Sequence, residues 1–250
     1  MSNQSRREAL RRQREAEAAA ARKKKMTIIG AGIVAFVLVV VGAVWLVFNF
    51  KDQIGATNAV PANANGDKSG IRVEPNKARQ GAVTVVVYQD YQCPFCKLFE
   101  QAFSSKLEAA ANAGTIQLEY RTMTFLDANL RNDASTRAAV GAACADNAGV
   151  YLDYHDAVYA NQPTSEGAGY SDDLLRVQIP TQIGLSGDKL AGFQKCYDTK
   201  ATLQFVNSVD QAAGRAGITS TPTYVIGGTD VTKQLDYNTP TSIDRFLPTS

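Results

Sequence analysis

Residues 28–48 form a run of 21 residues without a charged side chain, and this run limits the possible folds of the chain more than any other segment. At about 1.5 Å per residue, a helix of this length covers the roughly 30 Å hydrocarbon core of a bilayer. A helix in the core of a soluble domain would normally have a polar face, and this run has none. We therefore expect a single transmembrane anchor over residues 26–50.

The charges on either side of the run predict its orientation. Nine of the 26 lysines and arginines lie in residues 6–25, whereas the other flank offers only Lys51 beside Asp52. Because positive charge marks the cytoplasmic side, we expect residues 1–25 to be a basic cytoplasmic tail and the rest of the chain to lie outside the cell membrane. A cleaved signal peptide is the alternative, but its apolar part is usually only about 7–15 residues long.

The basic tail itself is interpreted as a solvated segment that sets topology. Contact with nucleic acid or anionic lipid is the alternative for such a charge cluster, and we predict no nucleic-acid partner. Residues 51–80, which follow the anchor, are rich in Ala, Asn, Gly and Lys and lack apolar periodicity. They predict an extracytoplasmic linker, with at most a short strand near residues 71–73, and not a dimerisation domain.

Two cysteines stand two residues apart after a strand-like segment. Residues 83–88 are almost all β-branched or aromatic, which is typical of a buried strand. Pro94 is tolerated in the first turn of a helix, and the apolar spacing after it predicts an amphipathic helix that lasts to Gly114. Cys93 is therefore expected at the N-terminus of this helix, with Cys96 one turn inside.

This placement favours redox chemistry. The free N–H groups and the dipole at a helix N-terminus stabilise an anion, so the pKa of Cys93 should be low. A low pKa makes Cys93 a good leaving group and stabilises the dithiol over the disulfide, which makes the pair more oxidising. Cys96 would be the resolving thiol, which releases Cys93 from a mixed disulfide.

A zinc site and a purely structural bridge are weaker interpretations of the pair. A structural zinc site needs four Cys or His ligands, and only Cys144, Cys196 and His155 remain, without finger-like spacing. A disulfide across two residues closes too short a loop to stabilise a fold much. We predict no metal and no organic cofactor.

The strand, the CPFC sequence that opens a helix and a distant GITSTPTYVIGG at residues 217–228 together resemble the DsbA-like thiol–disulfide oxidoreductases, in a membrane-anchored form. The resemblance covers roughly residues 71–248. It implies an α/β thioredoxin fold over residues 81–250, with an inserted helical domain at about 128–216, after the single transmembrane helix. It also implies a cis peptide bond at Thr221–Pro222, facing the cysteines and binding an extended substrate segment; the alternative for Pro222 is an ordinary residue at the start of a strand.

The middle of the chain reads as a second strand followed by helices. Residues 115–120 alternate like a core strand, and helical patterns follow over residues 134–147, 151–160, 172–183, 188–196 and 201–216. His155 has no Ser or Cys partner in sequence, so we expect a surface or half-buried helix residue and not a catalyst.

Three further residues complete the predicted site. Outside the cytoplasm Cys144 and Cys196 are expected to form a structural disulfide, with two buried free thiols, or exchange with the active site, as alternatives. Asp90 is a candidate for passing a proton to Cys96, the alternative being an ordinary carboxylate at a strand end.

The dipeptide Pro94–Phe95 tunes the pair in the family that the chain resembles. The best-known oxidases of this group have His where this chain has Phe95, so we expect a weaker oxidant. The resemblance implies an enzyme that introduces disulfides into exported proteins with free thiols and is reoxidised by a quinone-linked membrane partner of the DsbB or VKOR type. The alternatives are a reductase or isomerase fed with electrons across the membrane, and a tethered binding or chaperone module.

Overall fold

The computed structural model describes residues 39–40 and 58–248 of the chain. The expected cytoplasmic tail, and all of the expected anchor except residues 39–40, lie outside the described residues. Within the described ranges, none of the helices has the length and apolar character that crossing a bilayer requires. The unit that begins at residue 55 carries the fold described below.

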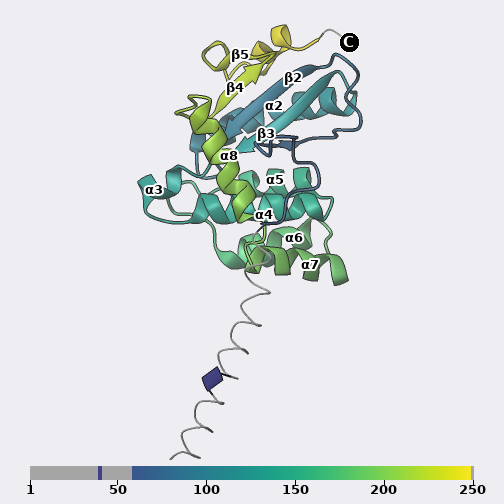
Figure 1. Ribbon diagram of the computed structural model, residues 1–250. Helices are drawn as coiled ribbons and strands as arrows, with labels where there is room; N and C mark the ends of the chain where they lie inside the picture. Colours follow the sequence, from purple (N-terminus) through teal and green to yellow (C-terminus); the bar gives the residue numbers. More distant parts are fainter. Residues whose placement is uncertain (1–38, 41–57, 249–250) are drawn as a thin grey trace, which may run out of the picture. The chain divides into compact units, whose positions relative to one another are not determined.

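A five-stranded sheet forms the centre of this unit, with the strand order β1-β3-β2-β4-β5 (Figure 1). The central strands β2 and β3 are parallel, and the other neighbours are antiparallel. The β-branched run predicted as a strand becomes β2, whose last five residues are all buried. The strands are β1 (Ile71–Arg72), β2 (Val83–Gln89), β3 (Ile116–Thr122), β4 (Thr223–Ile226) and β5 (Thr229–Asp230).

Helices cover both faces of the sheet because the side chains of β2 alternate between two apolar clusters. Val85 and Val87 belong to the main core, together with apolar residues of α2 (Pro94–Asn112). Val86 and Tyr88 face the other way and pack with Ala213 of α8 (Leu203–Arg215). In Figure 1, α8 crosses in front of the sheet and α2 lies behind it.

The remaining helices lie between β3 and α8 in the sequence and form the expected helical insertion. Its predicted end at about residue 216 is too late, because α8 packs against β3 and so belongs to the layer that covers the sheet. The helix expected over 172–183 is present as an unbroken helical run over residues 172–182, in which residues 174–178 are π-helical; Pro180, which has no N–H to continue an α-helical ladder, lies just after this π-helical turn. The helical segments are α3 (Leu126–Leu130), α4 (Ala134–Asn147), α5 (Tyr151–Ala160), the π-helical η2 (Leu174–Gln178), α6 (Ile179–Gln182) and α7 (Gly187–Asp198).

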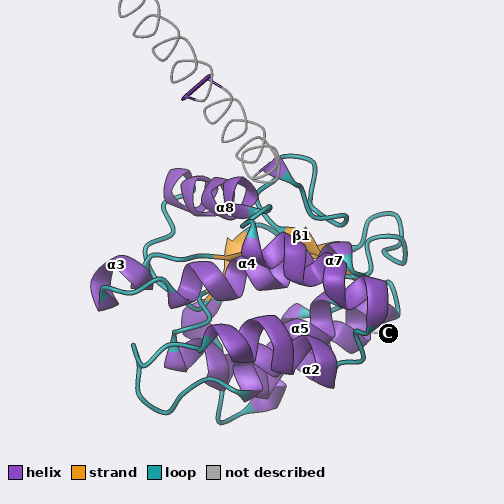
Figure 2. Ribbon diagram, turned by 90° about the horizontal axis from the view of Figure 1, so that it is seen from below, coloured by secondary structure: helices purple, strands orange, loops and turns teal. Residues whose placement is uncertain are grey.

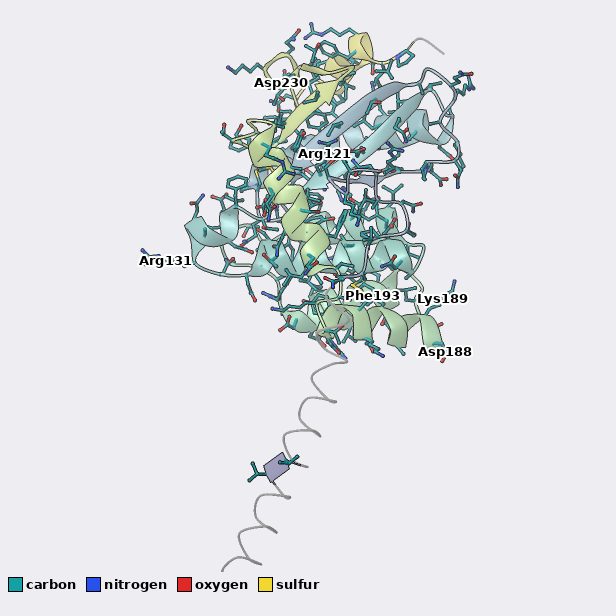
Figure 3. The ribbon with its side chains drawn as sticks, viewed as in Figure 1. Arg121, Arg131, Asp188, Lys189, Phe193 and Asp230 are labelled. Atoms are coloured by element: carbon teal, nitrogen blue, oxygen red, sulfur yellow. A yellow bond between two sulfur atoms is a disulfide. The ribbon has the colours of Figure 1, made fainter. Side chains whose placement is uncertain are left out.

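Cys144 of α4 and Cys196 of α7 are joined in the structure by a disulfide with an S–S distance of 2.01 Å. The bond connects positions 52 residues apart and ties α7 to the centre of the insertion. Figure 3 shows it as a yellow bond close to the labelled Phe193 of α7. The bond therefore joins two helices that also pack against each other.

The segment expected to be a linker is folded where the structure describes it, over residues 58–80. Asn65 is buried and donates a hydrogen bond to the Glu119 carboxylate of β3 at 2.7 Å, while Asn63 donates two to Asp146 of α4. Residues 71–72 form the edge strand β1, as the short strand near 71–73 predicted. The linker prediction was wrong over this range because polar side chains that find buried partners order a segment without apolar periodicity.

The chain after β5 completes the unit with two 3₁₀ helices, η3 (Thr232–Gln234) and η4 (Pro240–Phe246). Ile243 of η4 is fully buried in the main core. The C-terminal segment thus covers part of the α2 side of the sheet.

Candidate active site

Cys93 and Cys96 lie where β2 ends and α2 begins, as the spacing predicted. Cys93 is the N-cap residue of α2 with an extended backbone, and Pro94 occupies the first turn. Both cysteines are free and buried, with 6% and 3% of their surfaces exposed. Pro94 and Phe95 are exposed between them, Phe95 to 57%, so an apolar ring stands in solvent beside the thiol pair.

The loop before β4 faces the cysteines. The Thr221–Pro222 peptide bond is cis, and the Cys93 thiol donates to the carbonyl oxygen of Thr221 over 3.5 Å. Residues 128 positions apart in the sequence therefore meet at one sulfur atom. The cis peptide bond thus lies beside the cysteines, as the family resemblance implied, and substrate binding by this loop stays a prediction.

The two thiols have opposite acidities. The hydrogen bond from the Cys96 thiol is the main cause that lowers the pKa of Cys93 to about 6, and the N–H groups of Phe95 and Cys96 at the helix N-terminus add to it. Burial raises the pKa of Cys96 well above its ordinary value, and the neighbouring Cys93 raises it further. Cys93 is thus the thiolate at neutral pH, and Cys96 keeps its proton.

Side chains of the helical insertion hold the backbone that leads into Cys93. Gln162 donates to the carbonyl oxygens of Tyr91 and Cys93 at 2.7 and 3.0 Å. The Tyr170 hydroxyl donates to Tyr91 at 2.6 Å, and the Tyr159 hydroxyl donates to the carbonyl of Asp90 at 3.3 Å. Sequence reasoning missed all three donors, because nothing in their spacing links them to the cysteine pair.

Asp90 is fully buried, as a proton carrier inside the protein would be. Its carboxylate accepts hydrogen bonds from the Ser135 hydroxyl at 2.6 Å and from the N–H groups of Gln92 and Leu126. Burial is the main cause that raises its pKa to about 7. Neither cysteine forms a hydrogen bond with the Asp90 carboxylate, and the N–H of Cys93 donates only to the backbone carbonyl of Asp90, at 3.0 Å, so proton transfer from Asp90 to Cys96 stays a prediction.

The expectation for His155 was wrong. The ring lies on α5 and is completely buried, with its Nδ1 3.0 Å from the Tyr91 hydroxyl and its Nε2 3.2 Å from a carboxylate oxygen of Glu100. A helical pattern with polar neighbours gave no sign that this face of α5 packs on α2 and β3. His155 does not contact either cysteine through these nitrogen atoms.

A sheet with this strand order, a CxxC pair at a helix N-terminus and a cis-proline loop opposite define a thioredoxin-fold protein with a redox-type thiol pair. A model of the thioredoxin family matches residues 78–244, about two thirds of the chain. The chain therefore belongs to the thioredoxin family.

Solved structures with the same fold are DsbA-like. MdbA from Corynebacterium diphtheriae, described as a thiol-disulfide oxidoreductase, is 19% identical and aligns over 77% of this chain and 97% of that one, with a TM-score of 0.61. Reduced DsbA from Mycobacterium tuberculosis is 23% identical over 70% of this chain and 88% of that one, with a TM-score of 0.56. BdbD from Bacillus subtilis is 18% identical over 75% and 95%, also with a TM-score of 0.56. The fold is thus the DsbA-like form of the thioredoxin fold.

A curated relative is a much longer protein. The Na(+)/H(+) antiporter NhaA 3 of Salinispora tropica is 25% identical over 193 residues, which are 74% of this chain and 27% of the antiporter. The chain thus spans about a quarter of the length of this relative.

Proposed function

We propose that this protein is a thiol–disulfide oxidoreductase that introduces disulfide bonds into exported proteins at the Cys93–Cys96 pair. The observation that carries the proposal is the position of Cys93: a free thiol at a helix N-terminus, with a pKa lowered to about 6, opposite the cis Thr221–Pro222 loop. Membership of the thioredoxin family supports it. The thiol–disulfide oxidoreductases among the solved structures with this fold support it too.

The reaction moves two electrons from substrate to enzyme. A substrate thiolate attacks Cys93 Sγ in the disulfide form, the Sγ–Sγ bond breaks, and Cys96 leaves and takes up a proton. A second substrate thiolate then attacks the substrate sulfur of the mixed disulfide, and Cys93 leaves as a thiolate. The substrate gains one disulfide and the enzyme gains two reduced cysteines. The low pKa of Cys93 favours the second step, because a more acidic thiol is a better leaving group.

Sustained turnover requires an acceptor for these two electrons. A quinone-linked membrane reoxidase of the DsbB or VKOR type would restore the Cys93–Cys96 disulfide. The basic residues 6–25 followed by the uncharged run 28–48 support a membrane-anchored protein with its catalytic unit outside the cytoplasm. Protease accessibility of the folded unit in intact spheroplasts tests this orientation: we expect cleavage without lysis, and protection until lysis would contradict it.

Cysteine trapping tests the enzyme activity. In cells that produce Cys96→Ser, substrates should stay bound to Cys93 as mixed disulfides that reducing agent releases, because the resolving thiol is gone. The matched control is Cys93→Ser, which should trap none. Equal recovery of proteins with both variants would indicate a binding or chaperone module.

The redox state of the pair in cells tests the direction of electron flow. Alkylation after acid quenching should find Cys93 and Cys96 mostly as the disulfide if the protein is an oxidase. A mostly reduced pair would contradict the oxidase proposal and indicate a reductase or isomerase that receives electrons across the membrane.

A further inference from the structure

A second group of reactive side chains lies between α2 and α5, which run side by side in Figure 2. Glu100 comes from α2, and His155 and Asp156 come from α5. One ligand atom of each of these three residues lies within 4.8 Å of the others. The disulfide-exchange steps at Cys93 and Cys96 require none of these groups.

Two of the three residues direct buried polar atoms at each other. His155 Nε2 lies 3.2 Å from Glu100 Oε1, the distance of an ion pair, and neither atom has any other partner among the described residues. His155 is completely buried and Glu100 is 6% exposed. Each of these buried atoms therefore depends on the other alone, so the pair is suited to a metal ion placed between them.

The ring of His155 is held in one orientation. Its Nδ1 lies 3.0 Å from the Tyr91 hydroxyl and 3.2 Å from the side-chain amide of Gln89, and the Tyr120 ring lies against it at a centroid distance of 4.4 Å. When Nδ1 carries the proton and donates to this hydroxyl, with the carbonyl end of the Gln89 amide turned toward the ring, the lone pair of Nε2 faces Glu100 and Asp156. A histidine that binds a metal normally has such a partner on its other nitrogen.

The surroundings carry an excess of negative charge. Glu108 of α2 also has a buried oxygen without a hydrogen-bond partner. Burial first, and then the carboxylates of Asp156 and Glu100, raise the pKa of Glu108 to about 7. Among the described residues, no lysine or arginine forms an ion pair with Glu100, Glu108, Asp153 or Asp156.

We propose that Glu100, His155 and Asp156 bind one divalent transition-metal ion. One imidazole with two carboxylates suits Zn²⁺ or Mn²⁺ better than Ca²⁺, which prefers six or more oxygen ligands. Ligands about 2.0–2.2 Å from a tetrahedral zinc ion lie about 3.3–3.5 Å apart, close to the 3.2 Å between His155 and Glu100. Asp156 is exposed, so the third ligand lies on the solvent side of the two buried ones. This proposal departs from the sequence analysis, which predicted no metal, because the three ligands come from two helices distant in the chain.

The experiment must exclude the active-site thiols, which bind zinc when reduced. The full-length chain, purified in detergent, carries Cys93→Ser and Cys96→Ser, and ZnCl₂ is titrated against it in competition with a chromophoric chelator. We expect one Zn²⁺ per chain. The same titration with CaCl₂ should be at least tenfold weaker.

Two exposed carboxylates on α5 allow metal ligation to be distinguished from a nonspecific effect of negative charge on Zn²⁺ binding. Asp156→Asn should weaken Zn²⁺ binding at least tenfold, because a ligand is lost. Asp153→Asn removes the same charge three residues away and should change the affinity less than twofold. Equal effects of the two variants, or no stoichiometric binding by the parent protein, would overturn the proposal and leave a plain His155–Glu100 ion pair.

X-ray absorption at the zinc edge gives a readout that is independent of affinity. The zinc-loaded protein should show nitrogen and oxygen ligands with one imidazole and no sulfur. His155→Gln should lose the imidazole signal, with circular dichroism confirming that the variant is folded. A sulfur-containing shell, or an unchanged imidazole signal in His155→Gln, would contradict the assignment.

Discussion

Replacing Cys96 with Ala removes the group that lowers the pKa of Cys93 most. A hydrogen bond to a charged acceptor contributes about 1.5–3 kcal/mol, and one pKa unit corresponds to about 1.4 kcal/mol. The pKa of Cys93 should therefore rise from about 6 to about 7–8 in Cys96→Ala. The helix N-terminus should keep it below the ordinary value of 9.0.

The same numbers predict the redox consequence. With a pKa of about 6, Cys93 is about 90% thiolate at pH 7. Relative to a thiol that titrates at 9.0, this ionisation stabilises the reduced enzyme by about 1.4 kcal/mol at pH 7. For a two-electron couple, that free energy raises the reduction potential by about 30 mV. This is a modest gain, which agrees with an oxidant that lacks an imidazole between its cysteines.

The assay is the rate of iodoacetamide alkylation of the reduced full-length chain between pH 4 and pH 10. Cys144 and Cys196 are bonded to each other and do not react, so the rate in Cys96→Ala reports Cys93 alone. Cys96→Ser keeps an O–H donor and should hold the pKa below that of the Ala variant. An unchanged midpoint in Cys96→Ala, or a wild-type midpoint near 9.0, would refute the assigned cause.

Three further predictions follow from other contacts. Between about pH 4 and pH 7, Asp90 has released its proton in the unfolded chain but retains it in the folded protein. The free energy of unfolding should therefore fall with rising pH, by up to about 1.4 kcal/mol per pH unit. Asp90→Asn should remove this slope, measured by urea titrations at several pH values. The double replacement Cys144→Ser and Cys196→Ser opens a loop that spans 52 positions. On the chain-entropy model it should lower the free energy of unfolding by about 4 kcal/mol, measured by denaturant unfolding. A loss below about 1 kcal/mol would contradict this value. Gln162→Ala removes one donor from each of the carbonyls of Tyr91 and Cys93, which keep the Tyr170 hydroxyl and the Lys97 N–H as donors. It should lower stability by about 0.5–1.5 kcal/mol and also raise the pKa of Cys93, whereas a purely structural role would change stability alone.

Local patterns predicted most of the fold. The predicted helices at 134–147 and 151–160 are confirmed at both ends. These segments are strongly periodic, or bounded by Gly and Pro, and each can be identified from its own residues. The placement of Cys93 at a helix N-terminus could be predicted for the same reason, whereas the thioredoxin fold was implied by the resemblance to a known family.

Features that depend on distant partners could not be predicted in this way. The order of residues 58–80 depends on Glu119 and Asp146, which accept hydrogen bonds from two asparagines of this segment. The burial of His155 depends on how α5 packs against α2. In both cases a polar residue looks exposed in the sequence, and only its tertiary contacts show that it lies inside the protein.

The acidity of Cys93 therefore depends on the helical insertion as well as on its own helix. A thiolate is stabilised by N–H groups and destabilised by carbonyl oxygens that point toward it. The N–H groups of Phe95 and Cys96 stabilise the Cys93 sulfur, while Tyr159, Gln162 and Tyr170 hold the carbonyls of residues 90, 91 and 93. A carbonyl bound to these donors cannot rotate toward the sulfur without breaking a buried hydrogen bond. The insertion thus fixes the orientation of the loop dipoles and contributes to the redox chemistry without supplying a reacting atom.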